Sequence, residues 1–104
     1  MKATHNAGRI TSAQHMQLRL LAARLGRKKN SLVAEAVETL LADRLTPSDI
    51  DAPDAQSATH EAGKITAGLN AALKERAIWL ACRKEALTAN AIIYLLTYYR
   101  DRLE

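Results

Sequence analysis

Several residue types are scarce in this chain of 104 residues, and each shortage rules out a kind of protein. Cysteine occurs once, at Cys82, so no internal disulfide can form and no CxxC zinc motif is present. No apolar run approaches the roughly 20 residues that a membrane-spanning helix needs. The N-terminal residues MKATHNAGR lack the apolar stretch of a signal peptide. We therefore expect a cytoplasmic protein that makes no contact with a membrane.

Aromatic residues are also few, with one Trp, three Tyr and no Phe, yet apolar residues make up 48% of the chain. A half-chain of about 50 residues is too short to bury a stable core alone, so residues 1–104 are expected to form one domain. The formal charge is +4 and uneven. Residues 1–45 carry eight Lys and Arg against three acids, residues 59–104 seven against five, and residues 46–58 three acids alone. This balance is compatible with a polyanionic partner, although many basic proteins bind no nucleic acid.

The chain contains a degenerate tandem repeat with an offset of 55 residues. Residues 3–44 align without a gap with residues 58–99, and the best-matched part reads ATHNAGRIT in the first copy and ATHEAGKIT in the second. Two copies are too few for a solenoid and suit a pseudo-dimer, in which one chain imitates a two-fold homodimer. We expect a first unit at 3–45, an acidic linker at 46–58 and a second unit at 59–104, sharing one pseudo-two-fold domain.

Each copy predicts two helices. Apolar residues recur with helical spacing after Thr11, and Gly26 is suited to end that helix. Thr11 and Gln14 have the spacing of a capping box. Asn30 or Ser31 is expected to cap the second helix, and Pro47 to stop it. The expected apolar faces are Leu18, Leu21, Ala22 and Leu25, then Leu32, Ala36, Val37, Leu40, Leu41 and Leu45, and in the second copy Leu69, Leu73, Ala77 and Leu80, then Leu87, Ala91, Ile92, Leu95, Leu96, Tyr99 and Leu103.

The segments before the helices, residues 3–10 and 58–65, are predicted to be short strands. Their Ala, Asn and Gly residues are poor strand formers. Pairing between the two copies, with a layer of helices behind, would override that weak propensity. Two short antiparallel strands plus four helices give a mainly α fold.

A short strand, a helix, a glycine turn and a second helix, arranged to pair with a copy of itself, resemble the ribbon-helix-helix (Arc/MetJ-type) DNA-binding family. The resemblance lies in LRLLAARLGRKKNSLVAEAVETLL, from Leu18 to Leu41. With two such units in one chain, the protein is similar in organisation to the accessory proteins of conjugative relaxosomes. The second copy departs from the pattern, with Ala81 in place of Gly26 and Glu85-Ala86 in place of Asn30-Ser31.

The resemblance implies that an antiparallel two-stranded ribbon enters the major groove of double-stranded DNA. On this arrangement His5 would lie near Lys64 and His60 near Arg9, and Asn6 and Gly8 would face inward. Arg9 could pair with guanine, and the alternative is that Arg9 and Lys64 are solvated surface charges. The outward, base-reading positions would be His5, Ala7, Arg9 and Thr11 in the first copy and His60, Ala62, Lys64 and Thr66 in the second.

Basic residues gather at the start of each second helix, where free N–H groups and the helix dipole suit a phosphate. The expected phosphate contacts are Arg27, Lys28, Lys29, Asn30 and Ser31 in the first copy and Arg83 and Lys84 in the second. The alternative is a solvated turn with Asn30 or Ser31 acting only as a cap. Glu85 would repel phosphate, so the first half is expected to grip DNA more strongly.

The second copy carries apolar residues beyond its core stripe, and they are explained either as extra core or as a protein-contact surface. They are Ile78, Trp79, Ile93, Tyr94 and Tyr98. No metal site is expected, because the three His residues and the one Cys are not spaced as metal ligands usually are. No cofactor and no catalytic step are expected, because no nucleophile, base and acid form a recognisable set.

The leading hypothesis is a sequence-specific DNA-binding protein, either a transcriptional repressor or a plasmid-transfer accessory factor. A protein-interaction module, such as an antitoxin or an assembly protein, is the alternative. It would use the aromatic surface of the second copy to bind another protein or a second copy of the chain. A third hypothesis is a helical-hairpin repeat without a ribbon.

Overall fold

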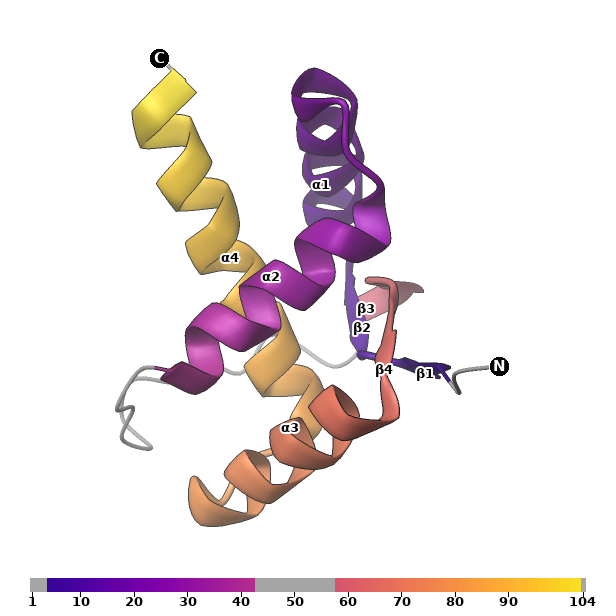
Figure 1. Ribbon diagram of the computed structural model, residues 1–104, viewed down its shortest axis with the longest axis vertical. Helices are drawn as coiled ribbons and strands as arrows, with labels where there is room; N and C mark the ends of the chain where they lie inside the picture. Colours follow the sequence, from indigo (N-terminus) through magenta and orange to yellow (C-terminus); the bar gives the residue numbers. More distant parts are fainter. Residues whose placement is uncertain (1–3, 43–57, 104) are drawn as a thin grey trace.

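The computed structural model describes residues 4–42 and 58–103. In this part of the chain the same order of elements occurs twice: two short strands and then two helices (Figure 1). The first set is β1 (Thr4–Asn6), β2 (Arg9–Thr11), α1 (Ser12–Leu25) and α2 (Lys29–Ala42), and the second is β3 (Ala58–Glu61), β4 (Lys64–Thr66), α3 (Ala67–Trp79) and α4 (Lys84–Leu103). The prediction of a mainly α fold with short antiparallel strands is confirmed. Leu45, Pro47 and nearly all of the expected linker lie outside the described residues.

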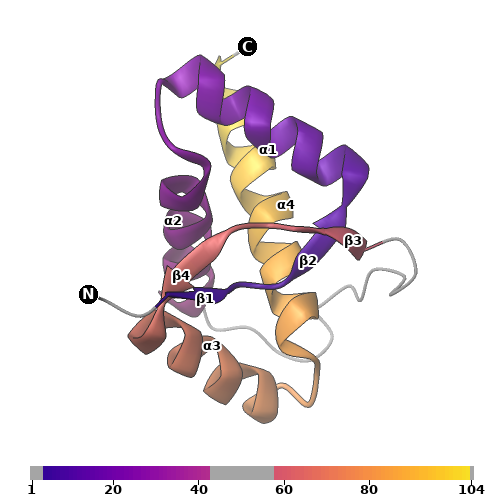
Figure 2. The same cartoon turned by 90° about the vertical axis from the view of Figure 1, so that its right-hand side faces the viewer.

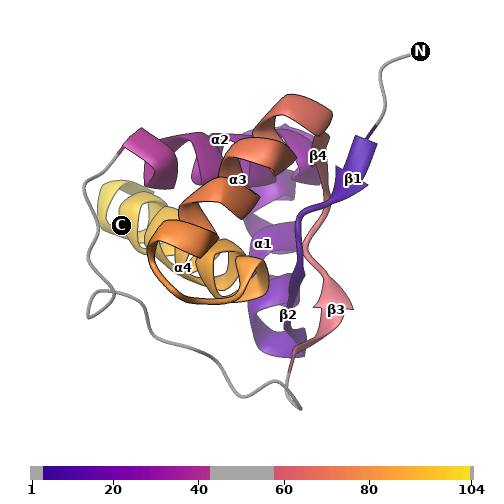
Figure 3. The same ribbon diagram turned by 90° about the horizontal axis from the view of Figure 1, so that it is seen from below.

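Strands and helices form two layers. The strands lie along one side of the molecule and the helices lie behind them (Figure 3). Helices α2 and α4 cross in the middle of the helical layer, with α1 and α3 at its two ends (Figure 1). Among residues 4–42 and 58–103, no helix has both the length and the hydropathy needed to cross a membrane.

Each of the described strands pairs with a strand of the other copy. β1 pairs antiparallel with β4, and β2 pairs antiparallel with β3 (Figure 2). Between these pairs the Ala7 N–H donates to the Gly63 carbonyl and the Ala62 N–H donates to the Gly8 carbonyl, both at 2.9 Å. The two short pairs therefore continue one another across the centre. Each predicted strand is present, but an Ala-Gly pair in its middle divides it into two short strands.

The helix boundaries follow local signals in the first copy. Thr11 Oγ1 accepts from the Gln14 N–H at 3.1 Å and Gln14 Oε1 accepts from the Thr11 N–H at 3.0 Å, which confirms the capping box. Gly26 ends α1 with a φ of 65°, as predicted. The predicted cap of the next helix is wrong, because α2 begins at Lys29 and so takes in Asn30 and Ser31.

The core draws side chains from both copies, on the helix faces that the apolar spacing predicted. Leu18, Leu32 and Val37 from the first copy and Leu73, Leu87 and Ile92 from the second are fully buried in a single cluster. Among the other expected positions, Leu25, Leu41, Leu69, Leu96 and Tyr99 pack against this cluster as partly buried side chains.

Candidate nucleic-acid interface

The ribbon turns a row of apolar side chains toward the helices. Ile10 and Ile65 are buried, and both lie in the middle of a short strand. Residues directly opposite each other in an antiparallel pair project from the same face. His5 is opposite Ile65 and His60 is opposite Ile10. Both histidines are exposed, but this register places them on the helical side of the ribbon, at its ends, and not on its outer face as expected.

The expectation that Ala7 and Ala62 face outward is also wrong, since both are fully buried. The cause lies in the glycines that follow them. Gly8 has a φ of 150° and Gly63 a φ of 157°, values that L side chains rarely adopt, and both glycines are buried. Each Ala-Gly pair therefore places two consecutive residues inward, and the alternation of faces is reset at the centre.

Close packing against the helices explains these glycines. A Cβ on Gly63 would lie 2.7 Å from Asn30 Oδ1, and a Cβ on Gly8 would lie 3.2 Å from Thr88 Oγ1. Thr88 Oγ1 also donates to the Ala7 carbonyl at 2.7 Å. The N-terminal parts of α2 and α4 therefore support the centre of the ribbon directly.

The outer face carries charged side chains from both copies. Arg9 is opposite Glu61, and Asn6 is opposite Lys64. Arg9, Glu61 and Lys64 are exposed, and Asn6 is half-buried. Arg9 and Lys64 therefore lie where the sequence placed them, on the side away from the helices. A carboxylate lies among them that sequence reasoning did not include.

Thr11 and Thr66, at the ends of the ribbon, cap helices. The hydroxyl of Thr66 accepts from the Leu69 N–H at 3.3 Å, as that of Thr11 accepts from Gln14. Each threonine is the N-cap of the helix that follows it. Their side-chain oxygens are thus committed to the start of α1 and α3.

Of the expected phosphate contacts in the first copy, Arg27 is held within the protein. Its guanidinium lies 3.3 Å from Glu35 Oε1 and donates to Ser31 Oγ at 2.9 Å and to Tyr99 Oη at 3.3 Å. Tyr99 in turn donates to Glu35 Oε2 at 3.0 Å, and burial, followed by this contact with Glu35, raises the pKa of Tyr99. This network ties α2 to α4, which makes Arg27 and Ser31 structural.

Asn30 is likewise engaged, because its Oδ1 accepts from the Lys64 N–H of the ribbon at 3.1 Å. Lys28 is exposed, and Lys29 is half-buried with its Nζ 3.2 Å from His15 Nε2. Within residues 4–42 and 58–103, Lys28 and Lys29 thus form no ion pair with a carboxylate, unlike Arg27.

In the second copy, Arg83 is exposed and Lys84 is held by two acceptors. Lys84 Nζ donates to the Asn6 carbonyl and to Asn70 Oδ1, both at 2.9 Å. Burial, then the neighbouring Lys74, lowers the pKa of Lys84, while Glu85 acts in the opposite direction. Lys84 therefore braces the ribbon, and Arg83 remains the exposed cation at the start of α4.

Comparison of the chain with protein-family models, with curated proteins and with solved structures found no match. The ribbon-helix-helix resemblance of Leu18–Leu41 therefore stays a prediction.

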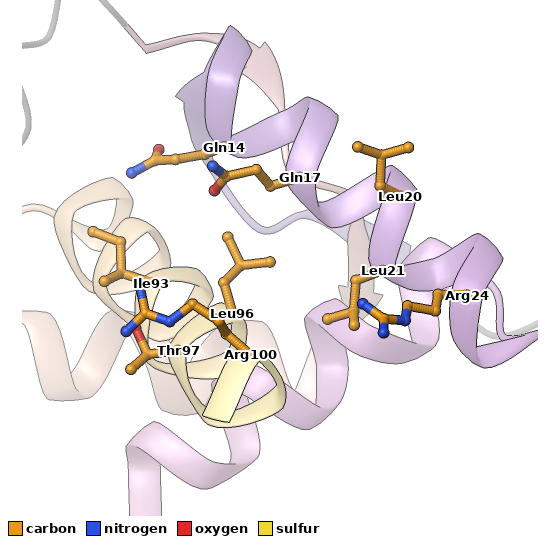
Figure 4. A pocket seen from close by; sticks show the side chains of 9 residues that line it. All are labelled: Gln14, Gln17, Leu20, Leu21, Arg24, Ile93, Leu96, Thr97 and Arg100. Carbon is orange, nitrogen blue, oxygen red and sulfur yellow. The ribbon is translucent and has the colours of Figure 1, made fainter. Parts of the chain in front are cut away.

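The extra apolar residues of the second copy are surface residues and do not add to the core. Ile93 lines a groove of about 430 Å³ between α1 and α4, to which Leu20, Leu21 and Leu96 also contribute (Figure 4). Tyr94 and Tyr98 line a separate hollow between α2 and α4. The exposed fractions are 80% for Ile78, 79% for Trp79, 39% for Ile93, 46% for Tyr94 and 49% for Tyr98.

The expectation that Asn6 faces inward is wrong, because Asn6 is opposite the exposed Lys64, and sequence reasoning missed Glu61 on the outer face and His15 beside the ribbon. Both errors on the outer face arose because the alternation of faces was counted straight through the glycines. The signal available was the Ala-Gly pair itself, repeated at the centre of both segments. His15 was missed because nothing in the sequence shows that its ring lies 5.1 Å from that of His60. Within the described residues no group of three His, Cys, Asp or Glu is placed to hold a metal ion.

Proposed function

We propose that the chain is a double-stranded DNA-binding protein that inserts its ribbon into the major groove. In this proposal it consists of two tandem ribbon-helix-helix units that form an intramolecular pseudo-dimer. The observation that carries the proposal is a two-stranded ribbon with Arg9 and Lys64 exposed on its outer face, which none of the four described helices covers (Figure 3). A major groove about 12 Å wide admits such a ribbon.

The central hydrogen bonds support the pseudo-dimer. Ala7 donates to Gly63 and Ala62 donates to Gly8, so exchanging the two copies of the repeat leaves this pair of bonds unchanged. The helices behind the ribbon are also related by this exchange, because each second helix contacts the strand of the other copy. Asn30 of α2 holds the strand of the second copy, and Thr88 of α4 holds the strand of the first.

Arg9 and Lys64 would read bases, since Arg donates two hydrogen bonds to guanine and Lys can donate to the same acceptors. Glu61 lies opposite Arg9 and would accept from cytosine N4 or orient the guanidinium. Lys28 and Arg83 would contact phosphates, which fixes the register without reading sequence. The protein then acts in the cytoplasm without catalysis, as a repressor or a plasmid-transfer accessory factor.

A selection on random duplex DNA at two salt concentrations tests the proposal. We expect affinity to fall steeply with salt, because cations that neutralise phosphates release counterions. Arg9→Ala and Lys64→Ala should relax base preference at individual positions, at about 1–3 kcal/mol per lost contact. Lys28→Ala should weaken binding to all sequences alike.

Arg100→Ala is the matched control, because Arg100 is an exposed cation near the C-terminal end of α4, at the far end of that helix from the ribbon (Figure 1). It removes the same charge and should leave base preference unchanged. Unaltered preference in the Arg9→Ala/Lys64→Ala double variant would refute base reading by the ribbon.

A protein-interaction role is the second candidate, favoured by the exposure of Ile78 and Trp79 at the end of α3. Adjacent apolar side chains of this exposure are typical of protein contacts. We propose a second copy of the chain as the occupant, so that two molecules bind adjacent DNA sites. Sedimentation should show weaker self-association for Trp79→Ser than for Leu20→Ser, which removes an exposed apolar side chain from the first copy. Monomeric wild type at high concentration would refute this role.

A further inference from the structure

One of the differences between the two copies beside the ribbon concerns a titratable residue. The repeat aligns Lys29 with Lys84 and His15 with Asn70. In the second copy, Lys84 Nζ donates to Asn70 Oδ1 at 2.9 Å. In the first copy, Lys29 Nζ lies 3.2 Å from His15 Nε2. The geometry of the lysine is thus conserved between the copies, but its partner is a titratable imidazole in one and a neutral amide in the other.

Further basic groups surround His15. Its ring centroid lies 5.1 Å from that of His60 on β3, with 31° between the ring planes. The charged groups that shift the pKa of His15 are Lys29 from α2, His60 from β3 and Arg19 from the next turn of α1, and all of them are bases. Burial, followed by these charges, lowers the pKa of His15. Three separate elements therefore bring positive or proton-binding groups to one place without a carboxylate among them.

This cluster has an unused capacity to bind an anion. Lys29 donates to a neutral imidazole nitrogen, which is a weak substitute for a negatively charged oxygen. An anion placed between Lys29 and His15 would accept from the ammonium and from a protonated imidazole together. A phosphodiester fits, because its two unesterified oxygens share one negative charge and can accept both donors.

The position of the cluster agrees with such a ligand. β3 and the first turn of α1 lie side by side at one end of the ribbon (Figure 2). A ribbon held in a groove has the phosphates of the groove edge beside its ends. We propose that His15, Lys29 and His60, with Arg19 nearby, form a binding site for one backbone phosphate of the duplex. This inference rests on the proposed function.

Proton uptake follows from the chemistry of the site. In the free protein, His15 Nε2 faces the Lys29 ammonium, and burial together with this charge lowers the pKa of His15 and so favours the neutral ring. A bound phosphate favours the protonated ring, so binding raises the pKa of His15 and draws a proton from solution. Affinity should therefore increase as pH falls through the range between the free and bound values. When one proton is taken up on binding, the affinity changes by up to about tenfold per pH unit.

The test compares wild type with His15→Asn, which gives the first copy the residue that the second copy has at position 70. Affinity for a labelled duplex of random sequence is measured at about pH 8 and about pH 6 at constant ionic strength, where histidine titrates. We expect wild type to bind more tightly at the lower pH and His15→Asn to lose about one proton of that dependence. His5→Asn, at the other end of the ribbon, should keep the His15 contribution. An equal pH dependence in wild type and His15→Asn would overturn the site.

A second measurement separates this inference from the proposed function. The pKa of His15 is followed by NMR during titration with inorganic phosphate and, separately, with a short duplex. A rise with both supports the site and its DNA ligand. A rise with inorganic phosphate alone, when wild type binds no duplex at low salt, would keep an anion site and overturn the DNA-binding function. No rise with either would overturn the site.

Discussion

The turn between α3 and α4 contains a strained residue whose replacement should stabilise the protein. Ala81 has a φ of 54°, close to the 65° of Gly26 at the aligned position of the first copy. In both turns the N–H of the next residue donates to a helical carbonyl five residues back, Cys82 to Ala77 and Arg27 to Ala22, each at 3.0 Å. An L-residue in this conformation costs roughly 1–2 kcal/mol relative to its right-handed form.

The expected increase in the free energy of unfolding of Ala81→Gly is smaller than the strain energy removed, because glycine also makes the unfolded chain more flexible. This entropy offsets about 0.4–1 kcal/mol. The free energy of unfolding should therefore rise by about 0.5–1 kcal/mol. A gain of 1 kcal/mol corresponds to an increase in Tm of about 4–8 °C in a domain of this size.

Gly26→Ala is the reciprocal variant. A Cβ at position 26 would meet nothing within 4 Å, so this change introduces the backbone strain without a clash. It should lower the free energy of unfolding by a similar amount. The Gly26→Ala/Ala81→Gly double variant should then return close to wild type. Urea unfolding followed by far-UV circular dichroism measures all three. Lower stability of Ala81→Gly than of wild type would refute the reasoning.

Two further predictions concern the ribbon and its flank. Gly63→Ala should destabilise the fold by about 1–3 kcal/mol in urea unfolding, because φ is 157° and the added Cβ would lie 2.7 Å from Asn30 Oδ1. Gly68→Ala in α3, where a Cβ meets nothing within 4 Å, is its control, and equal effects of both would contradict this account. In the absence of DNA, wild-type stability should decline as pH falls below about 6.5, because the lowered pKa of folded His15 lets the unfolded chain bind the proton first. His15→Asn should reduce this decline, and an identical pH profile for the two proteins would contradict the assignment.

The helices and their core could be predicted from the sequence, because the signals for them are local. Leu18 and Leu73 follow the apolar period of their helices, and both are fully buried. Thr11 and Gln14 are three residues apart and cap α1 as their spacing indicated. Such features depend on neighbours within one or two helical turns.

The faces of the ribbon could not be predicted in the same way. Their assignment counted positions back from Gly26 and assumed strict alternation along the strand, whereas Gly8 at a φ of 150° breaks that alternation. That conformation is selected by α4, whose Thr88 closes on the strand from 80 positions further along the chain. The engagement of Arg27, one of the expected phosphate contacts, was missed for a related reason. Arg27 is held by Tyr99, which belongs to the other copy, so its engagement is a tertiary effect.

Pairing of β1 with β4 and of β2 with β3 has a consequence during synthesis on the ribosome. Each strand of the first copy finds its partner only after residues 58–66 have been translated. At about 5–20 residues per second, the intervening stretch takes roughly 3–10 s to produce. During that interval the apolar face of the nascent first half, including Leu18 and Val37, has no second half to cover it. Folding of the first half therefore waits for translation of the second, and the emerging chain presents a transient surface to ribosome-associated chaperones.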